Sequence, residues 1–257
     1  MKRTLQQSAQ ALARERRVAE RSDTRSRFFV AMAVLLLVIA FVGFAPTFYL
    51  KSFFDTPALP WYLHVHAAVL TTWYALFLAQ TLLIATHRTA THQRVGVFTG
   101  VTAVLVILMT FTIILGANAS TEARGITRTP PIEFIVLGDL SVLAAFSILV
   151  PVGISCRHRP ALHKRAMLLA SIALIAPALA RLARFPVFAE AGPALVPAAL
   201  FSLLLAIWVH DLFTDRRVHA TTVWGSALIS GGLLASGMLA RTEAGKAFVA
   251  AISLGGG

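Results

Sequence analysis

Charged residues and cysteine are both scarce in this chain of 257 residues. Charged side chains make up 13% of the sequence, against about 25% in soluble domains, while 57% of the residues are hydrophobic. The single cysteine, Cys156, excludes an intramolecular disulfide and any metal motif built from several cysteines. The sequence also lacks a glycine-rich phosphate loop, an H-E-x-x-H motif and a nucleophile elbow. These absences argue against P-loop nucleotide binding, zinc-dependent proteolysis and α/β-hydrolase chemistry.

Long apolar runs take the place of the missing charge, and they predict an all-α polytopic membrane helix bundle of about seven transmembrane helices. Each run is long enough to cross about 30 Å of hydrocarbon as a helix. We expect one transmembrane domain (28–240) between a basic N-terminal tail (1–27) and a short C-terminal tail (241–257). Pro177 interrupts the fifth run, and the seventh contains no lysine for a retinal Schiff base. The spans are predicted near 28–50, 60–86, 95–116, 132–155, 165–184, 193–213 and 221–240.

Basic residues outnumber acidic ones by 23 to 11, and their distribution indicates a membrane topology. With the N-terminus in the cytoplasm, 16 Lys and Arg fall on the cytoplasmic side and 7 on the opposite side. We therefore expect a multi-pass protein of the bacterial inner membrane, with its N-terminus inside and its C-terminus outside. Lipid headgroups are the expected partners of this charge, and nucleic acid is not.

Two predicted cytoplasmic turns share the pattern H-R-x-A-x-H-x-R, at 87–94 and 158–165. Because the turns follow the second and fourth spans, spans two to five are expected to form a four-helix core made of two repeated hairpins. The repeat would gather four histidines on the cytoplasmic side of this core: His87, His92, His158 and His163.

Imidazole binds transition metals, and a b-type haem needs two axial histidines from different helices. We therefore expect the histidine quartet to bind a b-type haem or a transition metal. Alternatively, the quartet only offsets helix dipoles and anchors the helix ends to headgroups. Nearby basic residues could hold haem propionates or other anionic groups: Arg88, Arg94, Arg159, Lys164 and Arg165.

A second group of polar residues lies inside the predicted spans. His66, Trp73 and Gln80 are spaced by seven, with His87 continuing the series, so they form one stripe along the second span. Asp139 and Arg181 would lie at a depth similar to that of His66. The cluster of His66, Asp139 and Arg181 is expected to be a polar or proton-handling site, or else a purely structural clamp.

Three stretches carry a resemblance to a known group of proteins. They are the segment 44–50 (Phe-Ala-Pro-Thr-Phe-Tyr-Leu), the segment 63–66 (Leu-His-Val-His) followed by Trp73 and Gln80, and the segment 163–170 (His-Lys-Arg-Ala-Met-Leu-Leu-Ala) followed by Arg181. In these stretches the chain resembles an uncharacterised family of bacterial seven-helix inner-membrane proteins, from the first span to about Trp224. More distantly it resembles cytochrome-b561-like proteins, in which paired histidines in a four-helix bundle hold two b haems. This chain has only His64 and His66 on the outer side, on one helix, so it lacks the ligands for a second haem.

Three functions are open at this point. The first is a haem- or metal-binding redox protein, and the second is a non-catalytic accessory or assembly subunit of a larger membrane complex. The third is a small-molecule transporter or sensor that uses the polar interior.

Overall fold

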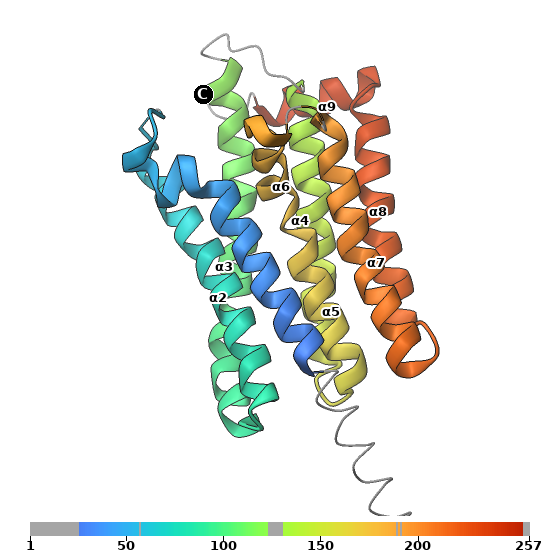
Figure 1. Ribbon diagram of the computed structural model, residues 1–257. Helices are drawn as coiled ribbons and strands as arrows, with labels where there is room; N and C mark the ends of the chain where they lie inside the picture. Colours follow the sequence, from blue (N-terminus) through green and yellow to red (C-terminus); the bar gives the residue numbers. More distant parts are fainter. Residues whose placement is uncertain (1–25, 57, 123–130, 189, 191, 254–257) are drawn as a thin grey trace, which may run out of the picture.

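The computed structural model describes residues 26–56, 58–122, 131–188, 190 and 192–253, and all regular structure in these ranges is helical. The helices run side by side in an elongated bundle (Figure 1). Most of the basic N-terminal tail and the C-terminal residues 254–257 lie outside the described residues. The helices are the first helix (Ser26–Tyr49), α2 (Trp61–Ala85), α3 (Thr89–Glu122), α4 (Ile132–Ser155), α5 (Pro160–Ala173), α6 (Ala176–Leu182), α7 (Leu195–Asp215), α8 (Ala220–Leu239) and α9 (Glu243–Ser253). Short helical turns are η1 (Ala45–Tyr49), which closes the first helix, η2 (Lys51–Phe53), η3 (Pro186–Phe188) and η4 (Gly192–Ala194).

The predicted all-α polytopic fold is confirmed. Six helices of the described chain are long and apolar enough to cross a membrane, and α5 with α6 forms a seventh span if the bent pair is counted as one. Large apolar side chains cover the outside of the bundle, as lipid contact requires. Phe98 on α3 is 69% exposed and Met238 on α8 is 72% exposed.

The turns between α2 and α3, α4 and α5, and α7 and α8 lie at the same end of the bundle, the lower end in Figure 1. This is the basic end, because these turns carry Arg88, Arg157, Arg159, Arg216 and Arg217. The first helix begins at the basic end, and α2 and α4 both run toward it. These two helices are therefore parallel.

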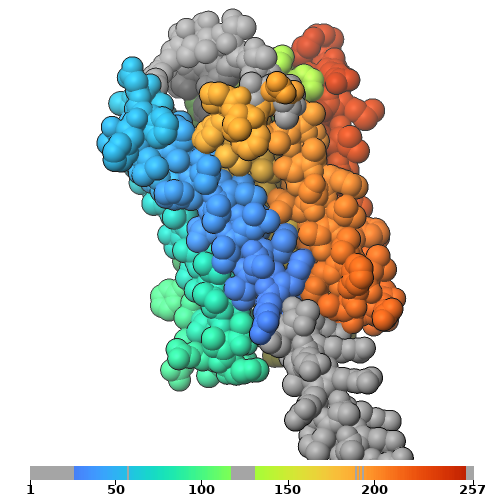
Figure 2. Space-filling model, viewed as in Figure 1, coloured from blue at the N-terminus to red at the C-terminus, as the bar shows by residue number. Residues whose placement is uncertain are grey.

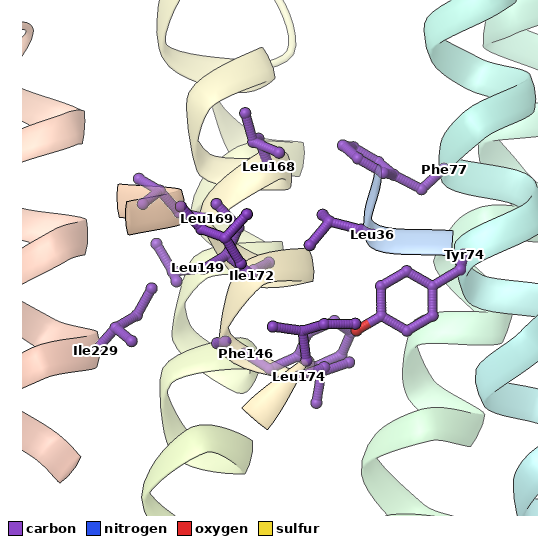
Figure 3. Close-up of a cluster of buried hydrophobic side chains, with 14 of the residues drawn as sticks. Leu36, Tyr74, Phe77, Phe146, Leu149, Leu168, Leu169, Ile172, Leu174 and Ile229 are labelled. Carbon is purple, nitrogen blue, oxygen red and sulfur yellow. The ribbon is translucent and has the colours of Figure 1, made fainter. Parts of the chain in front are cut away.

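The fifth span is broken between α5 and α6, which meet at an angle of 42°. Pro177 has no N–H to continue the helical ladder, and the N–H of Ile175 donates to Ile172 rather than to Ser171. The hydroxyl of Tyr74 on α2 donates instead to the free carbonyl of Ser171, at 3.1 Å. Figure 3 shows Tyr74 reaching across to Leu174 at this break. The predicted interruption at Pro177 is therefore confirmed, whereas α4 continues through Pro151.

The hydrophobic core lies where the first helix, α2, α4 and α5 meet, and Ile229 joins it from α8 (Figure 3). Phe146, Leu149, Leu168 and Ile172 are all fully buried. The first helix crosses the front of the bundle between α2 and α7 (Figure 2). It approaches α6 so closely that a Cβ on Gly43 would lie 2.6 Å from the carbonyl oxygen of Ala178.

The residues after the seventh span, expected to be a short tail, include the helix α9. It packs against α3 and α4, and Val249 is buried in a small cluster with Ile114 and Val136. Gly245 lies at the tight turn from α8, where a Cβ would meet the carbonyl oxygen of Leu239. The C-terminal segment is therefore part of the packed structure as far as Ser253.

Candidate functional site

The stripe on α2 faces protein, and a ring contact sets its register against α4. Trp73 is fully buried and packs edge-on against Phe146, with ring centroids 4.8 Å apart. Because α2 and α4 are parallel, residues seven positions earlier on each helix share the next layer toward the end opposite the basic end. That layer contains His66 and Asp139. The layer in the other direction contains Gln80 and Gly153.

The predicted cluster of His66, Asp139 and Arg181 is brought together through its arginine. Arg181 on α6 interacts electrostatically with both His66 and Asp139. Its Nη1 donates to the carbonyl oxygen of Pro177 at 3.1 Å, and its guanidinium lies 4.2 Å from the centroid of the Phe44 ring. Nδ1 of His66 and Nε1 of Trp73 are buried and have no hydrogen-bond partner in the part of the chain that the structure describes.

Gln80 connects the stripe on α2 to α3. Its buried amide satisfies every neighbour when its oxygen accepts from the N–H of Gly96 at 2.9 Å and from Oγ1 of Thr99 at 3.0 Å. Its nitrogen then donates to Nδ1 of His92 at 2.6 Å and to the carbonyl oxygen of His92 at 3.2 Å. The buried amide of Gln80 thus fixes the orientation of the His92 imidazole.

His92 and His163 lie next to each other, as the repeat predicted. Their ring centroids are 6.2 Å apart and the rings are nearly perpendicular. Each is the fourth residue of its helix, α3 or α5. Nδ1 of His163 lies 2.8 Å from the carbonyl oxygen of Gly153 on α4, and this contact holds the ring in place. Both rings are therefore positioned through Nδ1, and no protein hydrogen bond to Nε2 of either ring is seen within the described residues.

His87 and His158 do not share this arrangement. Both are exposed in the turns at the basic end, and His87 takes the left-handed backbone conformation (φ 59°) that closes α2. Of the predicted anion-binding residues, Arg88, Arg94 and Arg159 are exposed at the same end. Lys164 instead lies 4.7 Å from the centroid of the Phe29 ring, on the first helix.

Arg165 does not face outward as expected for an anion-binding residue. It is fully buried, and its Nε and Nη2 donate to Oδ1 of Asp211 on α7 at 2.9 and 2.5 Å. Nη2 also donates to Oδ2 of Asp215 at 2.9 Å, and Nη1 donates to the carbonyl oxygen of Ala161. Arg165 is therefore committed to an internal ion pair and has no donor directed toward an external anion.

Asp211 is the centre of this buried network. Its Oδ2 accepts from Oγ1 of Thr222 at 2.6 Å and from the N–H of His219 at 3.1 Å. Nε2 of His219 lies 2.8 Å from Oδ2 of Asp215. The sequence signal was the four-residue spacing: Asp211 and Asp215 lie one turn apart on α7, and His219 follows after the turn, just before α8.

The same three residues have the side-chain types of a metal site, with their potential ligand atoms within 4.8 Å of one another. However, the guanidinium of Arg165 already contacts both carboxylates. A second cation there would be repelled by the arginine at close range. The network is therefore an ion pair that joins α5, α7 and α8.

The fold and composition define this protein as an all-α, multi-pass membrane protein. No protein-family model, curated protein or solved structure matches the chain. Its function is therefore argued from the geometry of its own residues.

Proposed function

We propose that this protein is a membrane protein of redox type that binds a transition metal, as an ion or as haem iron, between His92 and His163. The observation that carries the proposal is the placement of two imidazoles from different helices at the same level of the bundle. Two imidazole nitrogens that share a metal at about 2.0–2.1 Å each would place their ring centroids roughly 6 Å apart. The separation in the structure is 6.2 Å.

The surroundings of His163 support this assignment directly. Histidines that bind metals usually donate their other ring N–H to a carbonyl or carboxylate, which fixes the tautomer. Nδ1 of His163 has such a partner in the carbonyl of Gly153. For His92 the partner is Gln80, whose amide nitrogen donates to Nδ1, so the proton of the neutral ring lies on Nε2. Metal binding at Nε2 would move that proton to Nδ1 and would require the amide to rotate, so that its oxygen accepts from Nδ1 and its nitrogen donates to Thr99.

The identity of the bound metal decides the chemistry. Imidazole suits iron, copper and zinc. Iron in haem or a copper ion would supply one-electron transfer, whereas zinc would restrict the pair to a structural role. If haem is bound, the exposed Arg88, Arg94 and Arg159 are the basic residues at the same end that could pair with its propionates.

The quartet itself provides a matched test. His92→Ala and His163→Ala are each expected to abolish stoichiometric metal or haem in the protein purified from membranes. His87→Ala and His158→Ala remove exposed histidines of the same sequence motif and are expected to leave the content unchanged. Equal metal content in all four variants would contradict the proposal, as would a loss that follows His87 or His158.

The distribution of charge supports a location in the bacterial inner membrane with the basic end in the cytoplasm. The arginine-rich turns that connect the spans lie at one end of the bundle, as the positive-inside rule requires. Arg124 and Arg128, which were counted on the opposite side, lie outside the described residues. Lipid headgroups are then the partners of the basic end.

A further inference from the structure

A second site is assigned by the charged residues at the end of the bundle opposite the basic end. His66 lies five residues into α2 and Asp139 seven residues into α4. At 1.5 Å per residue, both lie about 8–10 Å from the start of their helices. Arg181 reaches the same level from α6. These residues are remote from His92 and His163, which lie in the first turns of α3 and α5 at the basic end.

The break between α5 and α6 is what brings Arg181 to this level. The first helix holds the short helix α6: Gly43 allows it to approach Ala178, and Phe44 covers the guanidinium of Arg181. Broken helices at membrane depth are tolerated where they line a site buried in protein. The arginine is therefore held in place by backbone packing, independently of any acidic partner.

Arg181 and Asp139 attract each other but are not bonded. The two interact electrostatically, yet no hydrogen bond or ion pair joins them within the described residues. Among the described residues, the guanidinium makes one hydrogen bond, from Nη1 to the carbonyl oxygen of Pro177. Opposite charges inside a membrane protein normally pair with each other or with a ligand, because isolated ions are costly there.

A third polar group at this level also lacks a partner. Nδ1 of His66 is buried without a hydrogen bond to any described residue. Buried polar groups are almost always satisfied, so a bound water or ligand is expected to complete this one. The site therefore combines a cation, a separate anion, an unused imidazole nitrogen and the aromatic face of Phe44.

We propose that Arg181 and Asp139 bind a small zwitterion of the amino-acid type, with its carboxylate on Arg181 and its ammonium group on Asp139. A guanidinium is suited to a carboxylate through paired N–H donors, and a carboxylate side chain is suited to an ammonium group. A zwitterion is neutral overall and satisfies both charges at once. A simple anion would be repelled by Asp139, and a simple cation would be repelled by Arg181. This proposal names the class of ligand for the third function considered above, a small-molecule transporter or sensor. It does not depend on the proposal of a metal between His92 and His163.

The test uses the full-length wild-type protein in detergent or lipid nanodiscs and measures binding by calorimetry. L-leucine and L-alanine are the zwitterionic probes. 4-Methylpentanoate and propionate lack the ammonium group, and 3-methylbutylamine and ethylamine lack the carboxylate. We expect measurable binding of at least one zwitterion, and binding at least about tenfold weaker for its two matched single-charge analogues.

Two outcomes of this panel would overturn the proposal. Equal binding of the carboxylic acid and the zwitterion would show that Asp139 takes no part. Absence of binding by both zwitterions would show that the two charges serve only the protein and its bound water. The panel decides the question on the wild-type protein, even if a variant fails to fold.

Variants with matched controls locate the site. Asp139→Asn and Arg181→Gln are expected to abolish zwitterion binding. Glu133→Gln on α4 and Arg184→Gln just after α6 remove the same charges nearby and are expected to retain it. Binding that survives in Asp139→Asn and Arg181→Gln would place the ligand elsewhere. Because His92→Ala leaves these residues in place, zwitterion binding by that variant separates this site from the metal site.

Discussion

The guanidinium of Arg165 and the carboxylate of Asp211 are both fully buried and are joined by two hydrogen bonds to one carboxylate oxygen, at 2.9 and 2.5 Å. The other oxygen of Asp211 is bonded to α8 through Thr222 and the N–H of His219. This single carboxylate therefore connects three helices at the basic end. In a buried ion pair each charge compensates the other, so the loss of one partner leaves a buried charge uncompensated.

Replacement of Asp211 by Asn should destabilise the protein strongly, because Arg165 would keep its charge in a fully buried position. We expect a loss of about 3–5 kcal/mol in the free energy of unfolding, measured by unfolding in mixed micelles of increasing SDS content. Asp215→Asn is the control, since the side chain of Asp215 is 17% exposed and its neighbour Asp211 remains. Its loss should be clearly smaller, and equal losses in the two variants would contradict the central position of Asp211.

Gly43→Ala should destabilise the contact between the first helix and α6. The new Cβ would lie 2.6 Å from the carbonyl oxygen of Ala178, so the helices would have to move apart. Overpacking of this kind costs about 1–3 kcal/mol. Gly100→Ala is the matched control, because nothing lies within 4 Å of its Cβ position on α3. The control should be neutral or stabilising in the same SDS titration, and equal effects at the two glycines would contradict the packing described here.

Tyr74→Phe should weaken the bend between α5 and α6. Without its hydroxyl, the carbonyl of Ser171 loses the bond that replaces its helical partner. We expect a loss of about 1–3 kcal/mol, the cost of an unsatisfied buried acceptor. Tyr62→Phe, at an exposed position of the same helix, should change the free energy of unfolding far less. A Tyr74→Phe protein as stable as the control would show that another group satisfies Ser171.

The single cysteine provides a test of orientation without any substitution. Cys156 is half-buried at the end of α4, in a turn of the basic end. If this end is cytoplasmic, a membrane-impermeant maleimide should label the protein in inside-out vesicles and not in intact spheroplasts. Labelling of spheroplasts alone would reverse the topology. Denatured protein should be labelled in both preparations, as the control for thiol reactivity.

The spans could be predicted from the sequence because membrane insertion depends on the length of apolar runs, which is a local property. The approach of His92 and His163 was also predictable, since the repeated H-R-x-A-x-H-x-R motif places both at the same point of equivalent hairpins. The repeat did not reveal that its first histidines, His87 and His158, are exposed in the turns of the basic end. The left-handed conformation of His87 depends on how the turn after α2 closes.

The Arg165–Asp211 pair could not be predicted from the sequence in this way. Its members lie on α5 and α7, separated by 46 residues, and no sequence period relates the facing sides of two such helices. Arg165 also belongs to a basic motif in which Arg159 is exposed, as is Arg94 at the equivalent position of the first repeat, so composition alone indicated a surface position. Only the packing of α7 and α8 against α5 shows that this arginine turns inward.

The metal content of the wild-type protein tests the central claim most directly. The full-length chain is purified from membranes in mild detergent without chelators, and iron, copper and zinc are quantified against protein concentration, with an absorption spectrum to recognise haem. A site between His92 and His163 predicts close to one metal per chain, as haem iron with a Soret band or as a bound ion. Substoichiometric background levels of all three metals, with no Soret band and no uptake after addition of haem or of each ion, would contradict it.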